Sequence, residues 1–161
     1  MSDIISKCQG MPECQFDVGE VVMEEGHAGG ALYILAEGSL EILKQNFQIN
    51  TVDSPGSIFG DVSILLDLPH MATVKTLEPS RFLVAENAIE FLKANPDVHL
   101  HLSSLLAKRL NSVTNYLVDL KTQFEDSDDH LGMVDEVLES LLHHQPSKAE
   151  PTTDPEKPVG M

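Results

Sequence analysis

The stretch SPGSIFGDVSILLDLPHMATV, residues 54–74, resembles a loop that holds a phosphate group. Gly56 and Gly60 suit a turn in which the backbone takes up positive φ angles. The run 62–66 is too apolar for an exposed loop and predicts a helical turn. The segment contains no lysine or arginine, and His70 is its only basic side chain. The glycine turn and the helical run therefore indicate an anion site, whereas the lack of lysine and arginine does not.

Strand-like segments lie on both sides of this loop. Short alternating or wholly apolar runs, separated by glycines, predict strands at 20–24, 31–36, 39–44, 47–52, 72–77 and 81–85. Gln45-Asn46 suits a tight hairpin turn between two of these strands. Many short strands with frequent turns are typical of a rolled antiparallel β structure.

The pattern becomes helical after residue 86. A short helix is expected at 87–94, and Asn95-Pro96-Asp97 is a start signal for a long helix over 96–124. Apolar residues along it are spaced 4, 3, 4, 3 and 4, which predicts a narrow homodimer seam. The seam residues are Leu106, Leu110, Val113, Leu117, Leu120 and Phe124. The alternative is a helix that packs on its own β core, but a helix of this length would extend beyond a roll of short strands.

An acidic amphipathic helix is expected at 127–144. Its apolar face consists of Leu131, Val134, Leu138 and Leu141. Such a short helix is marginal in water, so we expect it to dock on the roll, on the dimer helix or on a partner. Residues 145–161 are polar and rich in proline, which predicts disorder. The expected organisation is a domain at 1–126, a helix at 127–144 and a tail at 145–161.

The charge of the chain argues against some partners. Asp and Glu number 26 against 10 Lys and Arg, so the net charge is −16 at pH 7. Neither nucleic acid nor an anionic membrane surface is expected, because both require clustered cations. We predict a cytoplasmic protein, because the sequence shows no secretory leader pattern and no apolar run of membrane-spanning length. Cys8 and Cys14 are then expected to remain reduced thiols.

The sequence resembles the cyclic-nucleotide-binding domain family over roughly residues 10–125. Two segments carry the resemblance: FDVGEVVMEEGHAGGALYILAEGSLEI at 16–42 and SPGSIFGDVSILLDLPHMATVKTLEPSRFLV at 54–84. The matching positions are Gly19, Glu20, Gly26, Tyr33, Gly38, Gly56, Phe59, Gly60, Pro69, Ala72, Thr73 and Val74. The resemblance implies an α+β fold: an antiparallel, jelly-roll-like β-roll with a short cassette helix, followed by C-terminal helices that include a long dimerisation helix.

The resemblance also implies a ligand, cyclic AMP or cyclic GMP, in a phosphate-binding cassette. In the family, a glutamate bonds the ribose, helix amides bind the phosphate and an arginine pairs with it. Here Asp61 stands in place of the glutamate, His70 in place of the arginine, and Met71 in place of a small residue. The implied ligand-binding residues are Phe59, Gly60, Asp61, Val62, Ser63, His70, Met71, Ala72 and Thr114. Without the arginine, binding is expected to be weak or absent.

We therefore predict a non-enzymatic regulatory module that controls a partner protein. His70 is either a weak, pH-dependent phosphate partner or a neutral histidine in a site that no longer binds. Lys75 and Arg109 are candidate substitute cations. One alternative is a ligand-independent dimeric interaction or scaffold domain. A remote alternative is a cupin-like metalloenzyme, which the helical spacing of His99 and His101 disfavours because positions i and i+2 do not share a helix face.

Overall fold

The computed structural model describes residues 2–124 and 128–143. The chain divides into two compact units, residues 1–103 and 104–161, and the boundary falls inside a helix. The first unit contains the β-roll and the predicted cassette. The predicted disordered tail at 145–161 lies outside the described residues.

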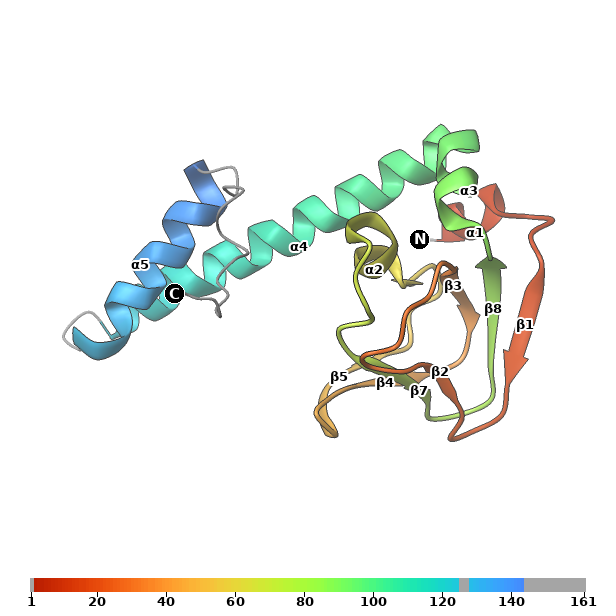
Figure 1. Ribbon diagram of the computed structural model, residues 1–161, viewed down its shortest axis with the longest axis horizontal. Helices are drawn as coiled ribbons and strands as arrows, with labels where there is room; N and C mark the ends of the chain where they lie inside the picture. Colours follow the sequence, from red (N-terminus) through yellow and green to blue (C-terminus); the bar gives the residue numbers. More distant parts are fainter. Residues whose placement is uncertain (1, 125–127, 144–161) are drawn as a thin grey trace, which may run out of the picture. The chain divides into compact units, whose positions relative to one another are not determined.

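Two four-stranded sheets form the roll of the first unit (Figure 1). One sheet has the order β1-β8-β3-β6, in which these strands span Glu13–Phe16, Ser80–Ala85, Leu32–Glu37 and Ile58–Phe59. The other has the order β2-β7-β4-β5, spanning Val21–Met23, Thr73–Thr76, Leu40–Lys44 and Phe47–Val52. Paired strands run antiparallel throughout these ladders. The predicted antiparallel roll is confirmed.

The turn between β4 and β5 follows from two residues. Gln45 and Asn46 have φ angles of 53° and 70°. Two successive residues with positive φ make the hairpin turn whose twist matches that of the flanking strands. Lys44 and Phe47 pair directly across it. The predicted Gln45-Asn46 hairpin is confirmed.

Phe82 is at the centre of the core between the sheets. Its side chain is 0% exposed. The rings of Phe16, Tyr33 and Phe59 meet it edge to face, with centroid distances of 5.6, 5.8 and 6.4 Å. Such edge-to-face pairs stabilise a core beyond the area that they bury. They tie β1, β3 and β6 to β8, so the strand that leads into the cassette is anchored in the core.

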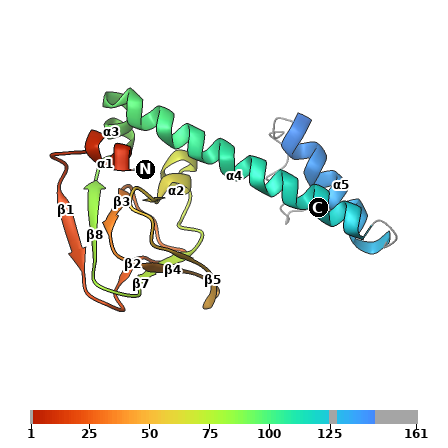
Figure 2. The same ribbon diagram turned by 180° about the vertical axis from the view of Figure 1, so that it is seen from behind.

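The helices are α1 (Ser2–Lys7), α2 (Asp61–Leu66), α3 (Ala88–Ala94), α4 (Pro96–Gln123) and α5 (Asp128–His143). Helix α1 and strands β1 and β6 extend the set expected from the sequence. Helices α1 and α3 lie side by side at the end of the roll where β8 finishes (Figures 1 and 2).

Asn95 lies at the start of α4, as the sequence predicts, but its side chain bonds to the end of α3. Its side-chain amide donates to the Phe91 carbonyl at 2.8 Å, so it satisfies the end of α3. Its own carbonyl accepts from the N–H groups of Val98 and His99 in the first turn of α4. The residue therefore satisfies backbone groups at both helix ends.

In the second unit, the predicted seam residues differ in exposure. Leu110, Val113 and Phe124 are exposed, whereas Leu106, Leu117 and Leu120 are half-buried. In α5, Leu138 is buried and Val134 and Leu141 are half-buried, in agreement with one apolar face. Lys121 of α4 forms an ion pair with Asp135 of α5. None of the helices in the described part of the chain is long and apolar enough to cross a lipid bilayer.

Candidate functional site

The predicted cassette forms a strand, a sharp turn and a short helix. Gly60 connects β6 to α2 with a φ of 90°. A Cβ atom at this position would lie 2.6 Å from the Ala31 carbonyl oxygen and 3.1 Å from Met23 Cε. Only glycine satisfies both the positive φ and the close approach to Ala31, the residue before β3. The turn therefore brings the start of α2 against the roll.

Buried polar groups mark the start of α2. Asp61 is 5% exposed and Ser63 is 4% exposed, although both are polar. The Ser63 hydroxyl donates to the Gly60 carbonyl at 3.4 Å. Phe59 is buried, Val62 and Ala72 are half-buried, and Met71 is exposed. Ser63 is thus hydrogen bonded within the chain, as buried polar groups usually are.

His70 is held in place on several sides. Its Nδ1 is hydrogen bonded to Ser63 Oγ at 3.0 Å. Its backbone N–H donates to the His27 carbonyl at 2.9 Å, and its carbonyl accepts from the Gly26 N–H at 2.9 Å. A Cβ atom at Gly29 would lie only 2.7 Å from His70 Nε2. The imidazole thus bridges α2 and the turn at 26–30.

The environment of His70 favours its neutral form. Burial lowers the pKa of His70, and the nearby His27 lowers this pKa further. Lys44 reaches the residue after His70: it donates to the Met71 carbonyl at 2.6 Å and lies 3.4 Å from a Glu25 carboxylate oxygen. The Lys44 charge is therefore offset by a neighbouring carboxylate.

A cavity of 390 Å³ adjoins His70. It lies between β2, the turn that follows it and the start of β3. Its lining residues are Val21, Val22, Met23, Glu24, His27, Ala28, Gly29, Ala31, Tyr33 and His70. Apolar side chains contribute to the walls, but more of the lining surface is polar than apolar.

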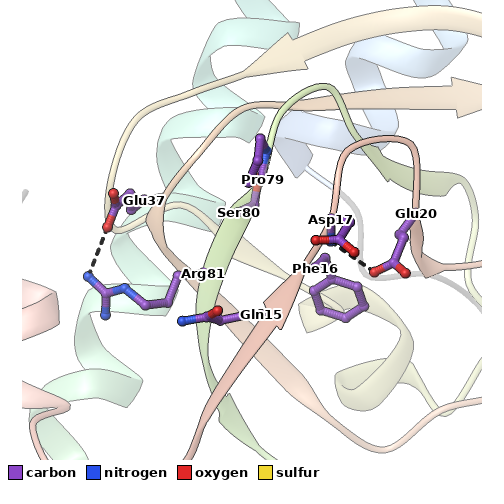
Figure 3. A pocket seen from close by; sticks show the side chains of 8 residues that line it. All are labelled: Gln15, Phe16, Asp17, Glu20, Glu37, Pro79, Ser80 and Arg81. Atoms are coloured by element: carbon purple, nitrogen blue, oxygen red, sulfur yellow. Dashed lines mark hydrogen bonds and ion pairs between the residues drawn. The ribbon is translucent and has the colours of Figure 1, made fainter.

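A second hollow, of 380 Å³, is lined by a different set of residues (Figure 3). Arg81 points toward Glu37 in this hollow and pairs with Glu37 and Glu13, each at 3.3 Å. The Asp17 N–H donates to a Glu20 carboxylate oxygen at 3.0 Å. Because two carboxylates engage the guanidinium, Arg81 is an internal ion-pair partner and not a substitute for the missing cassette arginine.

The predicted site residues fall into two groups. Residues 59–63 and 70–72 belong to the cassette of the first unit, where the Ser63–His70 bond joins the two ends of the segment. Thr114 belongs to the second unit, and its hydroxyl donates to the Leu110 carbonyl of its own helix at 2.8 Å. Sequence reasoning missed His27 and Gly29, which contact His70 from the turn after β2. The adjacent glycines at 29 and 30 were the only signal in the sequence for such a close approach.

We expect the half-buried His70 to make the stability of the roll depend on pH. The pKa of His70 in the folded chain lies below its ordinary value of 6.5, so the unfolded chain takes up the proton at higher pH. Stability is then lost as pH falls below 6.5, until the folded chain is protonated too. Between pH 7.5 and pH 5.5, the free energy of unfolding measured in urea should fall more for the unmodified chain than for His70→Gln. Equal losses in both chains would contradict this assignment.

Comparison with known proteins finds one matching family model and related sequences. Residues 13–90 match the sequence model of the cyclic nucleotide-binding domain. A cAMP-dependent protein kinase regulatory subunit of Yarrowia lipolytica is 32% identical over 74 residues, which cover 46% of this chain and 20% of that protein. The chain thus spans about a fifth of the length of this relative.

Two solved structures are similar in fold. The catabolite activator protein of Thermus thermophilus superposes with a TM-score of 0.63 and 22% identity, covering 76% of this chain and 60% of that chain. A structure described as cAMP-bound PfPKA-R superposes with a TM-score of 0.57 and 20% identity, covering 74% of this chain and 45% of that chain. At this level of identity, the likeness establishes the fold alone.

Proposed function

Residues 13–90 belong to the cyclic nucleotide-binding domain family, and from this premise we propose that the chain is a non-enzymatic regulatory module of the cytoplasm. It binds cyclic AMP or cyclic GMP weakly or not at all, and it controls a partner protein. The related kinase subunit is itself named as a regulatory subunit, which supports this class of function.

One observation carries the proposal of weak binding: a neutral, internally bonded histidine occupies the position of the phosphate-pairing arginine. His70 already has Ser63 as its partner at 3.0 Å. A phosphate would therefore meet an imidazole whose lowered pKa leaves it uncharged at neutral pH. An anion at the start of α2 would meet backbone N–H groups without a charge-assisted partner.

Calorimetric titration with cyclic AMP and cyclic GMP, at pH 7.5 and at pH 6.0, tests this proposal. Loss of one member of a buried charge pair costs about 2–5 kcal/mol, or roughly 30- to several-thousand-fold in affinity. We expect weak binding at pH 7.5 and tighter binding at pH 6.0, where more imidazolium is available to an anion. Submicromolar binding that does not change between the two pH values would contradict the role given to His70.

We assign the contact that controls a partner protein to helix α5. Its apolar face is partly covered, while Asp135, Glu136 and Glu139 are exposed on the helix. If ligand shifts the docking of α5, amide exchange in residues 130–143 should change more than exchange in β4 and β7 when cyclic AMP is saturating. A ligand shifts such an equilibrium only if it favours one arrangement. Unchanged exchange at 130–143 would favour the ligand-independent alternative.

Homodimerisation through α4 completes the proposal. Leu110 and Val113 are exposed, although they belong to the apolar seam, so a second copy of the helix would cover them. This agrees with the heptad spacing, which suits pairing of two long helices.

A Val113→Glu/Leu117→Glu variant should be monomeric. In a twofold dimer the two substitutions place four carboxylates in an apolar seam, where each is desolvated without a partner. The matched control, Asn111→Glu/Asn115→Glu, adds the same charge at exposed positions outside the seam and should remain dimeric. Analytical ultracentrifugation measures both. A monomer in the unmodified protein would contradict the dimer.

A ligand-independent scaffold is the second candidate function, and a specific contact favours it. The His70 imidazole already links α2 to the turn at Gly29. A cassette that its own side chain holds in place does not require a ligand to order it. If the protein binds no nucleotide but still forms a dimer, this second function is the correct one.

A further inference from the structure

The backbone of His70 is fixed to the turn at 26–30 by two hydrogen bonds. Its N–H donates to the His27 carbonyl and its carbonyl accepts from the Gly26 N–H, both at 2.9 Å. The ring can therefore change its place only by rotation of its own side chain. In the structure, Nδ1 of the ring is hydrogen bonded to Ser63 Oγ of α2 at 3.0 Å. The imidazole thus lies between the turn and α2, in a place set by the groups around it.

Gly29 leaves the space that this ring fills. A Cβ atom at Gly29 would lie 2.7 Å from His70 Nε2 and 3.2 Å from His70 Cε1. Non-bonded atoms pack best at about 3.5–4.0 Å, so a side chain at position 29 would overlap the ring. The φ angle of Gly29 lies outside the left-handed region, and an L residue can adopt it. The missing side chain is therefore required by the ring of His70 and not by the conformation of the turn.

The next residue, Gly30, provides the contrast. Its φ angle also lies outside the left-handed region. A Cβ atom at Gly30 would meet only the Glu86 carbonyl oxygen, at 3.9 Å, which is an ordinary van der Waals distance. Of these two adjacent glycines, only Gly29 makes room for the imidazole.

We propose that Gly29 is a positioning residue, which keeps the His70 imidazole bonded to Ser63 and so withholds it from an anion in the cassette. The inference rests on the proposed function, in which a cyclic nucleotide binds weakly because His70 is internally bonded. A methyl group at position 29 should push the ring away, because Nε2 is at the free end of a side chain that can rotate, whereas backbone bonds fix the turn. The displaced ring exchanges Ser63 for water.

Displacement of the ring should make His70 easier to protonate. Burial is the main cause that lowers the pKa of His70, and the nearby His27 lowers this pKa further. Glu24, His27 and Tyr33 line the same cavity as the ring, and Asp61 begins α2. An alanine at position 29 changes none of these groups and adds no charge. A rise in the pKa of His70 therefore reports that the ring has moved toward water.

The test is an NMR titration of the imidazole signals of the full chain, of Gly29→Ala and of the matched control Gly30→Ala. The His70 signal is identified by its absence from His70→Gln, and the exposed His99 serves as the internal reference. We expect the pKa of His70 to rise toward its ordinary value of 6.5 in Gly29→Ala and to stay unchanged in Gly30→Ala. Calorimetry should then show that cyclic AMP or cyclic GMP begins to bind Gly29→Ala more tightly at a higher pH than the unmodified chain.

A double-mutant cycle tests the same contact if Gly29→Ala is too unstable for the titration. Gly29→Ala should lower the urea midpoint of the unmodified chain, because the Ser63–His70 bond is lost. In His70→Ala the same substitution should leave the midpoint unchanged or raise it, because alanine restricts the unfolded chain. Gly30→Ala should change the midpoint equally in the two backgrounds. An equal effect of Gly29→Ala in the two backgrounds would overturn the inference.

The remaining outcomes separate the inference from the function beneath it. An unchanged pKa of His70 in Gly29→Ala overturns the inference and leaves the proposed function standing. An equal rise in Gly30→Ala means that the whole turn has loosened, which overturns the role of Gly29. A rise confined to Gly29→Ala, with no binding of either nucleotide at any pH, supports the inference and contradicts the ligand-responsive form of the proposed function.

Discussion

Replacement of Phe82 by alanine is expected to destabilise the roll by about 3–5 kcal/mol, the usual cost of removing a fully buried aromatic side chain. Phe82 is completely buried and meets Phe16, Tyr33 and Phe59 edge to face. The substitution creates a cavity between the sheets and removes three ring contacts at once. Urea unfolding of the purified protein measures the loss.

Phe47→Ala is the matched control for this prediction. Phe47 is the same residue type in the same roll, but its side chain is 73% exposed on β5. Its replacement should change the free energy of unfolding by less than about 0.5 kcal/mol, as is usual for surface positions. Similar losses for the two variants would contradict the placement of Phe82 at the centre of the core.

A His70→Arg variant should bind cyclic AMP or cyclic GMP more tightly, by roughly 30-fold to several-thousand-fold. The guanidinium restores a permanent cation that donates two parallel hydrogen bonds to a phosphate, whereas the imidazole is neutral and bonded to Ser63. Calorimetry at pH 7.5 measures the gain, with circular dichroism to show that the variant is folded.

The matched variant His70→Gln keeps the position polar but uncharged, so it should not increase affinity. An equal gain in His70→Gln would mean that removal of the imidazole, and not the added charge, is responsible. Unchanged affinity in His70→Arg would show that position 70 does not face the phosphate.

The roll could be predicted from the sequence because its determinants are local. Gln45 and Asn46 adopt positive φ angles, which asparagine tolerates well, so the hairpin follows from the two residues themselves. Gly60 is likewise visible in the sequence as a turn residue. Strand β6 was missed because it has only two residues, Ile58 and Phe59, and its pairing with β3 is a long-range contact. Periodicity does not appear in so short a segment.

The site was predictable only in part. The cassette segment and the replacement of arginine by His70 can be read from the sequence, because both lie in one contiguous stretch. The contacts of His70 with His27 and Gly29 cross about forty residues of sequence, and they depend on how β2 and β7 pair. These contacts, together with burial, decide the protonation state of His70, so its role depends on tertiary structure.

If the cassette is the nucleotide site, a bound nucleotide should perturb the start of α2. Amide chemical shifts of isotope-labelled His70→Arg protein should be recorded with and without saturating cyclic AMP. We predict that the largest changes occur at Gly60, Asp61 and Ser63, at the start of α2. Changes that cluster instead around Glu37, Ser80 and Arg81, in the hollow of Figure 3, with the start of α2 unmoved, would contradict it.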